Sequence, residues 1–190
     1  MKTALIVITL CIIGTIPGWG QSRKMQEPGT PMRVGSIFLN AGAGAGANYR
    51  GYDYHSPFGL KASVEFGLWH AGPGVITLGP ELGATISSYR FYNGYDNYHS
   101  HTVIMAARSA WHFGWKVRGL DTYAGLSAGV GIHHFDYYNT DNRHESYNES
   151  FPAIGAFAGA SYFVSPHFGF NAEAGFDINN FQLGIVFKLK

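Results

Sequence analysis

Hydrophobic and polar residues alternate strictly between Pro57 and Leu68. Phe58, Leu60 and Phe66 fall on one side of this stretch, and Lys61 and Glu65 fall on the other. A period of two is typical of a strand with one apolar and one polar face. The pattern recurs after residue 30 and predicts eight strands, near residues 33–47, 57–68, 74–88, 100–113, 120–133, 151–164, 167–178 and 180–190.

The predicted connections alternate in length. Those near 48–56, 89–99 and 134–150 are long and rich in Tyr, Asn, Asp and His, whereas those near 69–73, 114–119, 165–166 and 177–180 are short. Bacterial membrane barrels have long external loops and short periplasmic turns in alternation. Only the seventh connection departs, because it is short where an external loop is allowed to be long. The pattern predicts an all-β fold, an eight-stranded antiparallel up-and-down transmembrane β-barrel.

The two faces differ in charge when the parity is carried through all the strands. The face with Phe58 and Leu60 has no charged residue in the body of the strands, which predicts contact with lipid. The opposite face collects Lys61, Glu65, Glu81, Arg108, Asp121, Glu173 and Lys188. A soluble lipocalin-like barrel is the alternative fold, and it would have these faces inverted.

Charged residues inside so narrow a barrel must be paired, because side chains fill the lumen at this strand number. We expect Arg108 to pair with Glu81 or Asp121, and Lys61 or Lys188 to pair with Glu65 or Glu173. The alternative function for these charges is an ion path. Glycines on the lumen side of the first strand leave room for inward bulk, for which the candidates are Tyr123, Phe157 and His112.

The first twenty residues have the pattern of a secretory signal. Lys2 precedes an apolar core at 4–13, and Gly18 and Gly20 form a small-x-small cleavage site before Gln21. We expect a signal peptide over 1–20, a periplasmic lead-in over 21–32 and a barrel domain over 33–190. The run is too short and too broken for a membrane-anchoring helix.

Composition narrows the function classes. Cys11 is the only cysteine and lies in the predicted signal, so that the mature chain has no disulfide or thiolate site. Thirteen Lys and Arg residues nearly balance twelve Asp and Glu residues, which indicates no nucleic-acid partner. Charged residues make up 13% of the chain, against about 25% in an ordinary soluble domain.

The last strand carries a specific motif. Gln182, Gly184, Phe187 and Leu189 match the polar-x-Gly-x-x-aromatic-x-hydrophobic signal of outer-membrane barrels, with Lys190 as one additional residue. The chain resembles the small outer-membrane barrels of the OmpX, Ail and OmpA-transmembrane type. The resemblance implies a bacterial outer-membrane location, contact with outer-membrane lipid and lipopolysaccharide, and recognition by the barrel-assembly machinery. It leaves the activity open, because the group includes adhesins, serum-resistance factors, structural anchors and lipid-modifying enzymes.

The long loops are the first candidate for function. Tyr combined with Asn, Asp and Ser suits adaptable recognition, since Tyr offers rigid amphipathic contact area. The candidate recognition residues are Tyr52, Tyr54, Tyr92, Tyr95, Tyr137 and Tyr138. We expect a structural or surface-recognition protein, with an external protein or glycan as a candidate partner.

A hydrolase at the membrane rim and a small pore are the alternatives. A lipid-deacylating rim enzyme would draw on His99 or His101, with Ser87, Ser88 or Ser100 and Asp141 or Glu145. A metal site would need His133, His134 or His144 to join His99 and His101. No ordered motif ties either set together, so we predict no catalytic residue, cofactor or metal.

Overall fold

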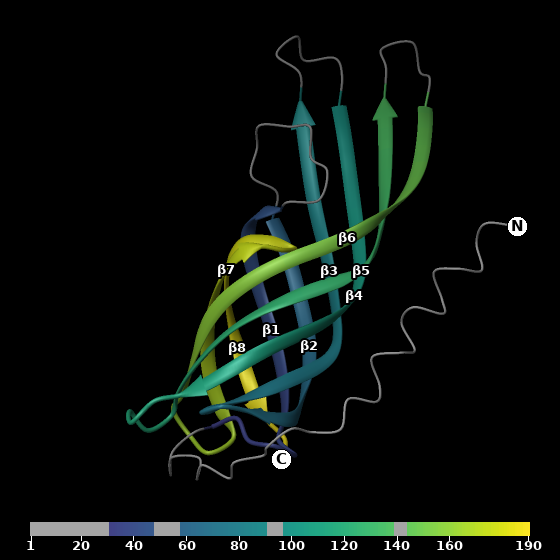
Figure 1. The fold of residues 1–190 in the computed structure, drawn as a ribbon. Coiled ribbons are helices and arrows are strands. Elements are labelled where there is room, and N and C mark those ends of the chain that lie inside the picture. Colours follow the sequence, from purple (N-terminus) through teal and green to yellow (C-terminus); the bar gives the residue numbers. More distant parts are fainter. Residues whose placement is uncertain (1–30, 48–57, 91–96, 139–143) are drawn as a thin grey trace, which may run out of the picture.

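The computed structural model describes residues 31–47, 58–90, 97–138 and 144–190, which form a closed β-barrel (Figure 1). Its strands are β1 (Ile37–Ala47), β2 (Phe58–Ala71), β3 (Gly74–Arg90), β4 (Asn97–Gly114), β5 (Leu120–Tyr138), β6 (His144–Phe163), β7 (Phe168–Phe176) and β8 (Asn179–Lys188). Each strand pairs antiparallel with the next, and β8 pairs with β1. The predicted eight-stranded antiparallel up-and-down barrel is confirmed. Over the same residues, no helix is long and apolar enough to cross a membrane.

Inward and outward residues alternate as the sequence predicts. Leu60, Leu82 and Ile154 expose 51%, 56% and 67% of their surface, whereas Lys61 and Glu65 expose 5% and 1%. Among the strand residues whose side chains the structure describes, none of those that face outward is charged. An apolar exterior around a charged interior contradicts the lipocalin-like alternative, which requires the opposite arrangement.

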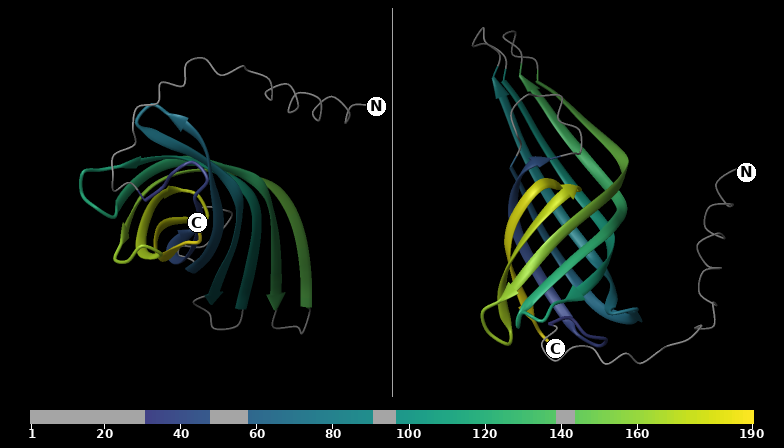
Figure 2. Two further views of the ribbon diagram at one scale, coloured as in Figure 1. Left: turned by 90° about the horizontal axis from the view of Figure 1, so that it is seen from below. Right: turned by 60° about the vertical axis from the view of Figure 1, so that its left-hand side comes forward.

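The wall of the barrel is much taller on one side. Pairing between β2 and β3 ends at Phe58↔Ile86, and pairing between β6 and β7 ends at Ala156↔Phe176. The neighbouring pairs continue far beyond these points, to Arg90↔Asn97 and Tyr138↔His144. Strands β3 to β6 therefore project past the closed barrel as a four-stranded sheet (Figure 2).

This projection corrects the predicted loop boundaries. The loop expected at 134–150 is strand at both ends, because β5 continues to Tyr138 and β6 begins at His144. The loop expected at 89–99 is likewise shortened by Arg90 and Asn97. Polar residues occupy both faces here, so the alternation of hydrophobicity stops although the backbone pairing does not.

Apolar side chains fill the lumen at three levels. At the end with the short turns, one cluster comprises Met32, Phe38, Val75, Phe163 and Val186. A second cluster, next to the interior charges, comprises Ala110, Tyr123 and Phe157. A third cluster, beneath the projecting sheet, comprises Ile104, Ala153 and Ile178. Met32, which the sequence assigns to the lead-in, is fully buried in the first of these clusters.

The short connection between β7 and β8 folds into the barrel. Asp177 and Ile178 are buried, with exposures of 1% and 0%. Gly83 on β3 admits the Ile178 side chain, since a Cβ at this glycine would collide with it. The turn thus closes the lumen from the side on which the sheet projects.

The side chains that occupy the space beside the β1 glycines differ from those expected. A Cβ at Gly42 would meet the Gln182 side chain, and one at Gly44 would meet Asn179. Both partners lie on the adjacent strand β8, so the expected filling by Tyr123, Phe157 and His112 is wrong. Those three side chains instead belong to the packing around Arg108, described next.

Candidate functional site: the charged lumen and the two rims

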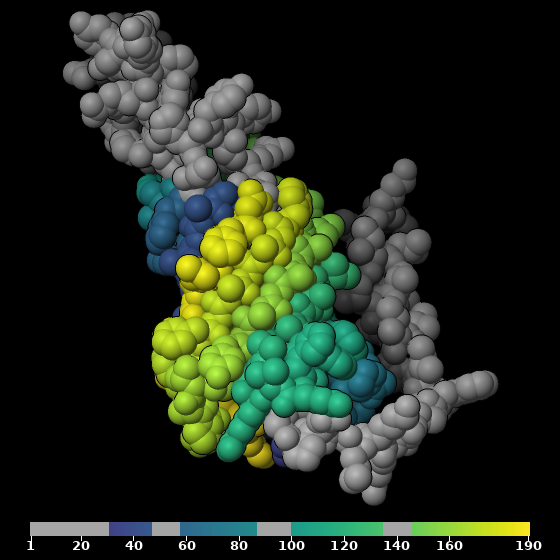
Figure 3. Space-filling view, turned by 90° about the vertical axis from the view of Figure 1, so that its left-hand side faces the viewer, coloured from purple at the N-terminus to yellow at the C-terminus, as the bar shows by residue number. Residues whose placement is uncertain are grey.

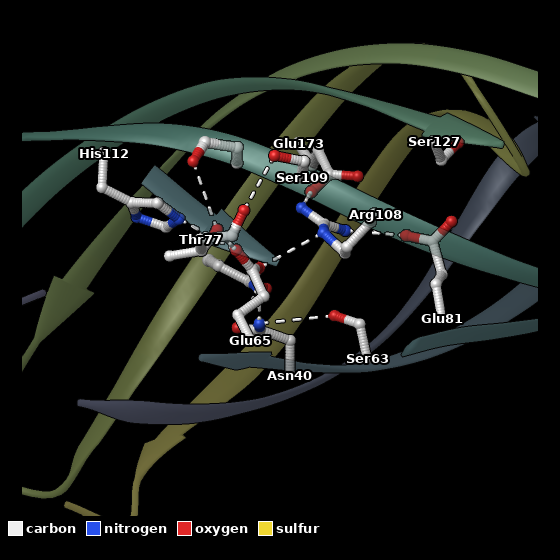
Figure 4. Close-up of polar contacts among 12 residues, drawn as sticks. Asn40, Ser63, Glu65, Thr77, Glu81, Arg108, Ser109, His112, Ser127 and Glu173 are labelled. Atoms are coloured by element: carbon white, nitrogen blue, oxygen red, sulfur yellow. Dashed lines mark hydrogen bonds and ion pairs between the residues drawn. The ribbon is translucent and has the colours of Figure 1, made fainter. Parts of the chain in front are cut away.

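Arg108 on β4 is the centre of the interior charges (Figure 4). Its Nη1 lies 2.8 Å from Oε2 of Glu81, and its Nη2 lies 3.0 Å from Oε2 of Glu173. Its Nε lies 3.2 Å from Oε1 of Glu65. The guanidinium carbon also lies 3.9 Å from the centre of the Phe157 ring. One cation therefore holds carboxylates from β2, β3 and β7 across the lumen.

Lys61 on β2 extends this set toward the β7–β8 turn. Its ammonium lies 2.8 Å from Oδ2 of Asp177 and 3.7 Å from Oε2 of Glu81. It also bonds Glu173, whose other oxygen accepts from Arg108. Glu173 thus bridges the two cations, and the β7–β8 turn is tied to β2 through Asp177.

His112 on β4 continues the chain of polar contacts toward the short turns. Its Nδ1 lies 2.7 Å from Oδ2 of Asp121, and its Nε2 lies 2.9 Å from Oε2 of Glu65. An ionised carboxylate only accepts hydrogen bonds, so two such partners fit an imidazole that carries both protons. Its ring stacks on Tyr123 at 5.0 Å between centres.

Neutral side chains donate hydrogen bonds to two of the buried carboxylates, Glu65 and Asp177. Thr77 donates to its Oε2 at 2.7 Å, and Asn40 donates to its Oε1 at 3.1 Å. Ser127 donates to Oδ1 of Asp177 at 2.9 Å. Buried charges are tolerated when paired and hydrogen-bonded in this way. The arrangement ties strands from different parts of the barrel together.

The structure brings together six of the seven interior residues proposed from the sequence. Lys61, Glu65, Glu81, Arg108 and Glu173 form one network, which Asp121 joins through His112. Asp121 therefore contacts His112 and does not pair with Arg108. Lys188 lies apart, at the rim with the short turns, where its ammonium donates to the carbonyl of Pro31 at 2.8 Å.

Two members of the network were missed by reasoning from the sequence. Asp177 follows the last residue of β7, where turn residues carry no face assignment. His112 shares the inward parity of Arg108, and that parity is the signal that could have found it. We expected His112 to be only a space-filling ring.

The assembly signal lies on the strand that closes the barrel. Gln182 is buried on the lumen side, whereas Phe187 and Leu189 are exposed on the outside. Gly184 pairs with Gly42 on β1 and Asn171 on β7. Recognition of this strand by the assembly machinery stays a prediction.

The proposed recognition residues lie at the other rim. Tyr52, Tyr54, Tyr92 and Tyr95 fall outside the described residues. The backbones of Tyr137 and Tyr138 belong to β5, opposite Tyr98 and Asn97 on β4. Both residues are therefore strand residues of the projecting sheet, contrary to the loop expected from the sequence.

His101 pairs with His134 across β4 and β5, but the histidines of this rim have different side-chain partners. Thr102 contacts Nδ1 of His133 at 2.8 Å, and Asn148 contacts Nδ1 of His134 at 2.6 Å, while His101 is exposed. Within the described ranges, no group of three or more His, Cys, Asp or Glu side chains is placed to hold a metal ion. The side chains of His99, Ser87, Ser88 and Glu145 fall outside that description.

Comparison with known proteins concerns the fold alone. In sequence, no family model and no curated protein matches the chain. A major outer membrane protein from Thermus thermophilus matches 81% of this chain and 99% of its own, with a TM-score of 0.53 and 11% identity. The chain has the fold of this outer-membrane protein.

Two further outer-membrane barrels match less well. The N-terminal β-barrel domain of Pseudomonas aeruginosa OprF gives a TM-score of 0.47 at 18% identity, over 82% of this chain and 98% of that one. Ail of Yersinia pestis, in complex with the heparin analogue sucrose octasulfate, gives 0.46 at 13% identity, over 80% and 93%.

Proposed function

We propose that the protein is an integral barrel of the bacterial outer membrane, with a closed lumen, that presents its projecting sheet outside the cell for recognition. The apolar exterior supports the membrane location. Exposed side chains such as Leu126, Val130 and Ile154 would be unfavourable in water but favourable against lipid tails. The location implies outer-membrane lipid, lipopolysaccharide and the barrel-assembly machinery as partners.

The filled lumen favours this function over the pore alternative. Arg108, Glu65 and His112 are almost completely buried between the cluster at Met32 and the cluster at Ile178. In an eight-stranded barrel, side chains suffice to fill the interior. Both ends and the middle of the lumen are occupied by protein.

The observation that carries the proposal is the continued pairing of β3 to β6 past the barrel. Asn97↔Tyr138 and Tyr138↔His144 lie far beyond the last pair of β6 with β7, Ala156↔Phe176. A barrel that only anchored itself would need strands just long enough to cross the apolar layer. The additional strand length displays polar and aromatic residues such as Tyr147, which exposes 66% of its surface.

The orientation follows from the short turns and from the side on which the sheet projects. Turns 72–73, 115–119 and 164–167 lie at one end, and the connection 48–57 and the projecting parts of β3 to β6 lie at the other. Periplasmic turns of bacterial barrels are short. The projecting sheet then faces outward, where a protein or glycan of the surroundings can reach it.

Replacing Tyr137 and Tyr138 by Ser tests the recognition surface. Cells that display the variant should lose binding to those immobilised glycans and matrix proteins that retain cells with the unchanged chain, because Tyr supplies much of the contact area in such surfaces. The matched control is Tyr162→Ser, an exposed tyrosine at the far end of β6. Equal binding by both variants would count against recognition, while a heat-modifiable gel band checks that each barrel has folded.

A further inference from the structure

Among the described side chains, those exposed at the rim with the short turns carry charge of one sign. Arg33, Lys116, Arg118 and Lys190 are exposed there, and Lys188 is half-buried. The described acidic residues lie elsewhere, since Glu65, Glu81, Asp121, Glu173 and Asp177 are buried in the lumen and Glu149 lies on the projecting sheet. The rim therefore attracts anions.

Three of these cations line one recess of about 500 Å³. Its walls come from the segment before β1, the β4–β5 turn, the β6–β7 turn and the end of β8, and the two turns lie side by side in Figure 3. The lining residues are Pro31, Arg33, Arg118, Gly119, Tyr162, Phe163, Val164, Ser165, Pro166 and Lys188. None of them is acidic, and the volume lies within the range of roughly 300–1,000 Å³ typical of small-molecule sites.

Hydrogen bonds fix the walls of the recess. The Phe163 amide donates to the Gly119 carbonyl at 2.8 Å, and the Lys188 amide donates to the His167 carbonyl at 2.9 Å. Gly119 has φ = +84°, a conformation that favours glycine, and this lets the β4–β5 turn approach β6 closely. The site is therefore built before any ligand arrives.

Lys188 donates its described hydrogen bond to a neutral group. Its ammonium donates to the Pro31 carbonyl, which positions the charge without cancelling it. Arg33 and Arg118 line the same recess as Lys188. Like charges around one recess attract an anion, and guanidinium groups match phosphate oxygens well.

The outer border of the recess is apolar. Tyr162 and Val164 line it and expose 51% and 56% of their surface on the outward face of the barrel. Tyr162 pairs with Phe170, which continues this apolar face on β7. A ligand that fits has an anionic head and a hydrocarbon tail.

We propose that this recess binds the phosphate headgroup of a glycerophospholipid in the periplasmic leaflet. Arg33, Arg118 and Lys188 hold the phosphate, and the acyl chains run along Tyr162 and Val164. The inference rests on the proposed membrane location, because only in that location does the recess lie at the level of lipid headgroups.

Native mass spectrometry of the full barrel in non-ionic detergent tests the inference with phosphatidylglycerol as the probe. We expect saturable retention of the lipid, weakened about fivefold by Arg118→Gln or Arg33→Gln, since each basic group near a headgroup contributes that order of affinity. The matched control is Lys116→Gln, which removes the same charge from the same turn outside the recess. It should leave retention unchanged.

Two further ligands distinguish binding of a lipid headgroup from binding of a free anion or of acyl chains alone. Diacylglycerol with the same chains should not be retained, and inorganic phosphate should compete poorly. Full competition by inorganic phosphate would show a free-anion site and overturn the lipid assignment. Equal weakening by Lys116→Gln and Arg118→Gln, or no saturable retention, would overturn the site itself. A barrel absent from the outer membrane would instead refute the proposed function, which fractionation of the same cells reports separately.

Discussion

Arg108 shows how single residues hold this barrel together. Its guanidinium contacts Glu65, Glu81 and Glu173, and its central carbon lies over the Phe157 ring. Burying four charges is unfavourable unless each finds partners, so the contacts offset desolvation more than they add stability. The network chiefly fixes which strands meet, because its carboxylates come from β2, β3 and β7.

Loss of Arg108 should be costly. Arg108→Met leaves three buried carboxylates without their shared cation, and we expect the free energy of unfolding to fall by about 3–5 kcal/mol. Lys116→Met, at an exposed lysine outside the recess, should change it by less than about 0.5 kcal/mol. Urea unfolding in lipid vesicles measures both, and similar midpoints for the two variants would contradict the role given to Arg108.

At the scale of elements, the β7–β8 connection acts as an internal plug. Ile178 packs with Ile104 and Ala153, and Asp177 bonds Lys61 and Ser127. Neither side chain could be assigned a face from the sequence, because turn residues interrupt the period of two on which parity depends. Met32 was missed for the same reason.

Strand residues were predictable because lipid and lumen impose opposite demands on alternate positions. Lys61 and Glu65 were correctly placed inside by the alternation from Pro57 to Leu68. Reasoning from the sequence left only alternative ion-pair partners for these charged residues. Which side chains meet across the lumen depends on the register between strands, and the sequence does not show that register. The ends of β5 and β6 escaped prediction because both of their faces are polar.

The fit of Ile178 against Gly83 gives a test at this scale. Ile178→Ala should lower the free energy of unfolding by about 2–5 kcal/mol through the cavity it leaves. Gly83→Ala should lower it by about 1–3 kcal/mol through overpacking. In the double variant the added methyl enters the vacated space, so the combined loss should be smaller than the sum. Strictly additive losses in urea unfolding would show that the two residues do not share this space.

The whole molecule combines a filled cylinder with a one-sided projection. Strands β1, β2, β7 and β8 end where the barrel closes, whereas β3 to β6 carry a sheet beyond it (Figure 1). Clusters at Met32 and Ile178 close the two ends of the lumen. The shape suits a membrane anchor for an external surface better than it suits a conduit.

A filled lumen predicts the absence of steady conductance. Purified protein in planar bilayers should give no stable single-channel steps, because Arg108, Lys61 and their carboxylates occupy the cross-section. Reproducible ohmic steps that change with Arg108→Met would revive the pore alternative.

Labelling of single cysteines on intact cells tests the membrane orientation most directly. The only native cysteine, Cys11, lies in the predicted signal peptide, so Tyr147→Cys and Lys116→Cys each supply one thiol to the mature chain. A membrane-impermeant maleimide should label Tyr147→Cys on intact cells, and label Lys116→Cys only after the outer membrane is permeabilised. The reverse pattern, or equal labelling of both positions on intact cells, would contradict a barrel that spans the outer membrane with its sheet outside.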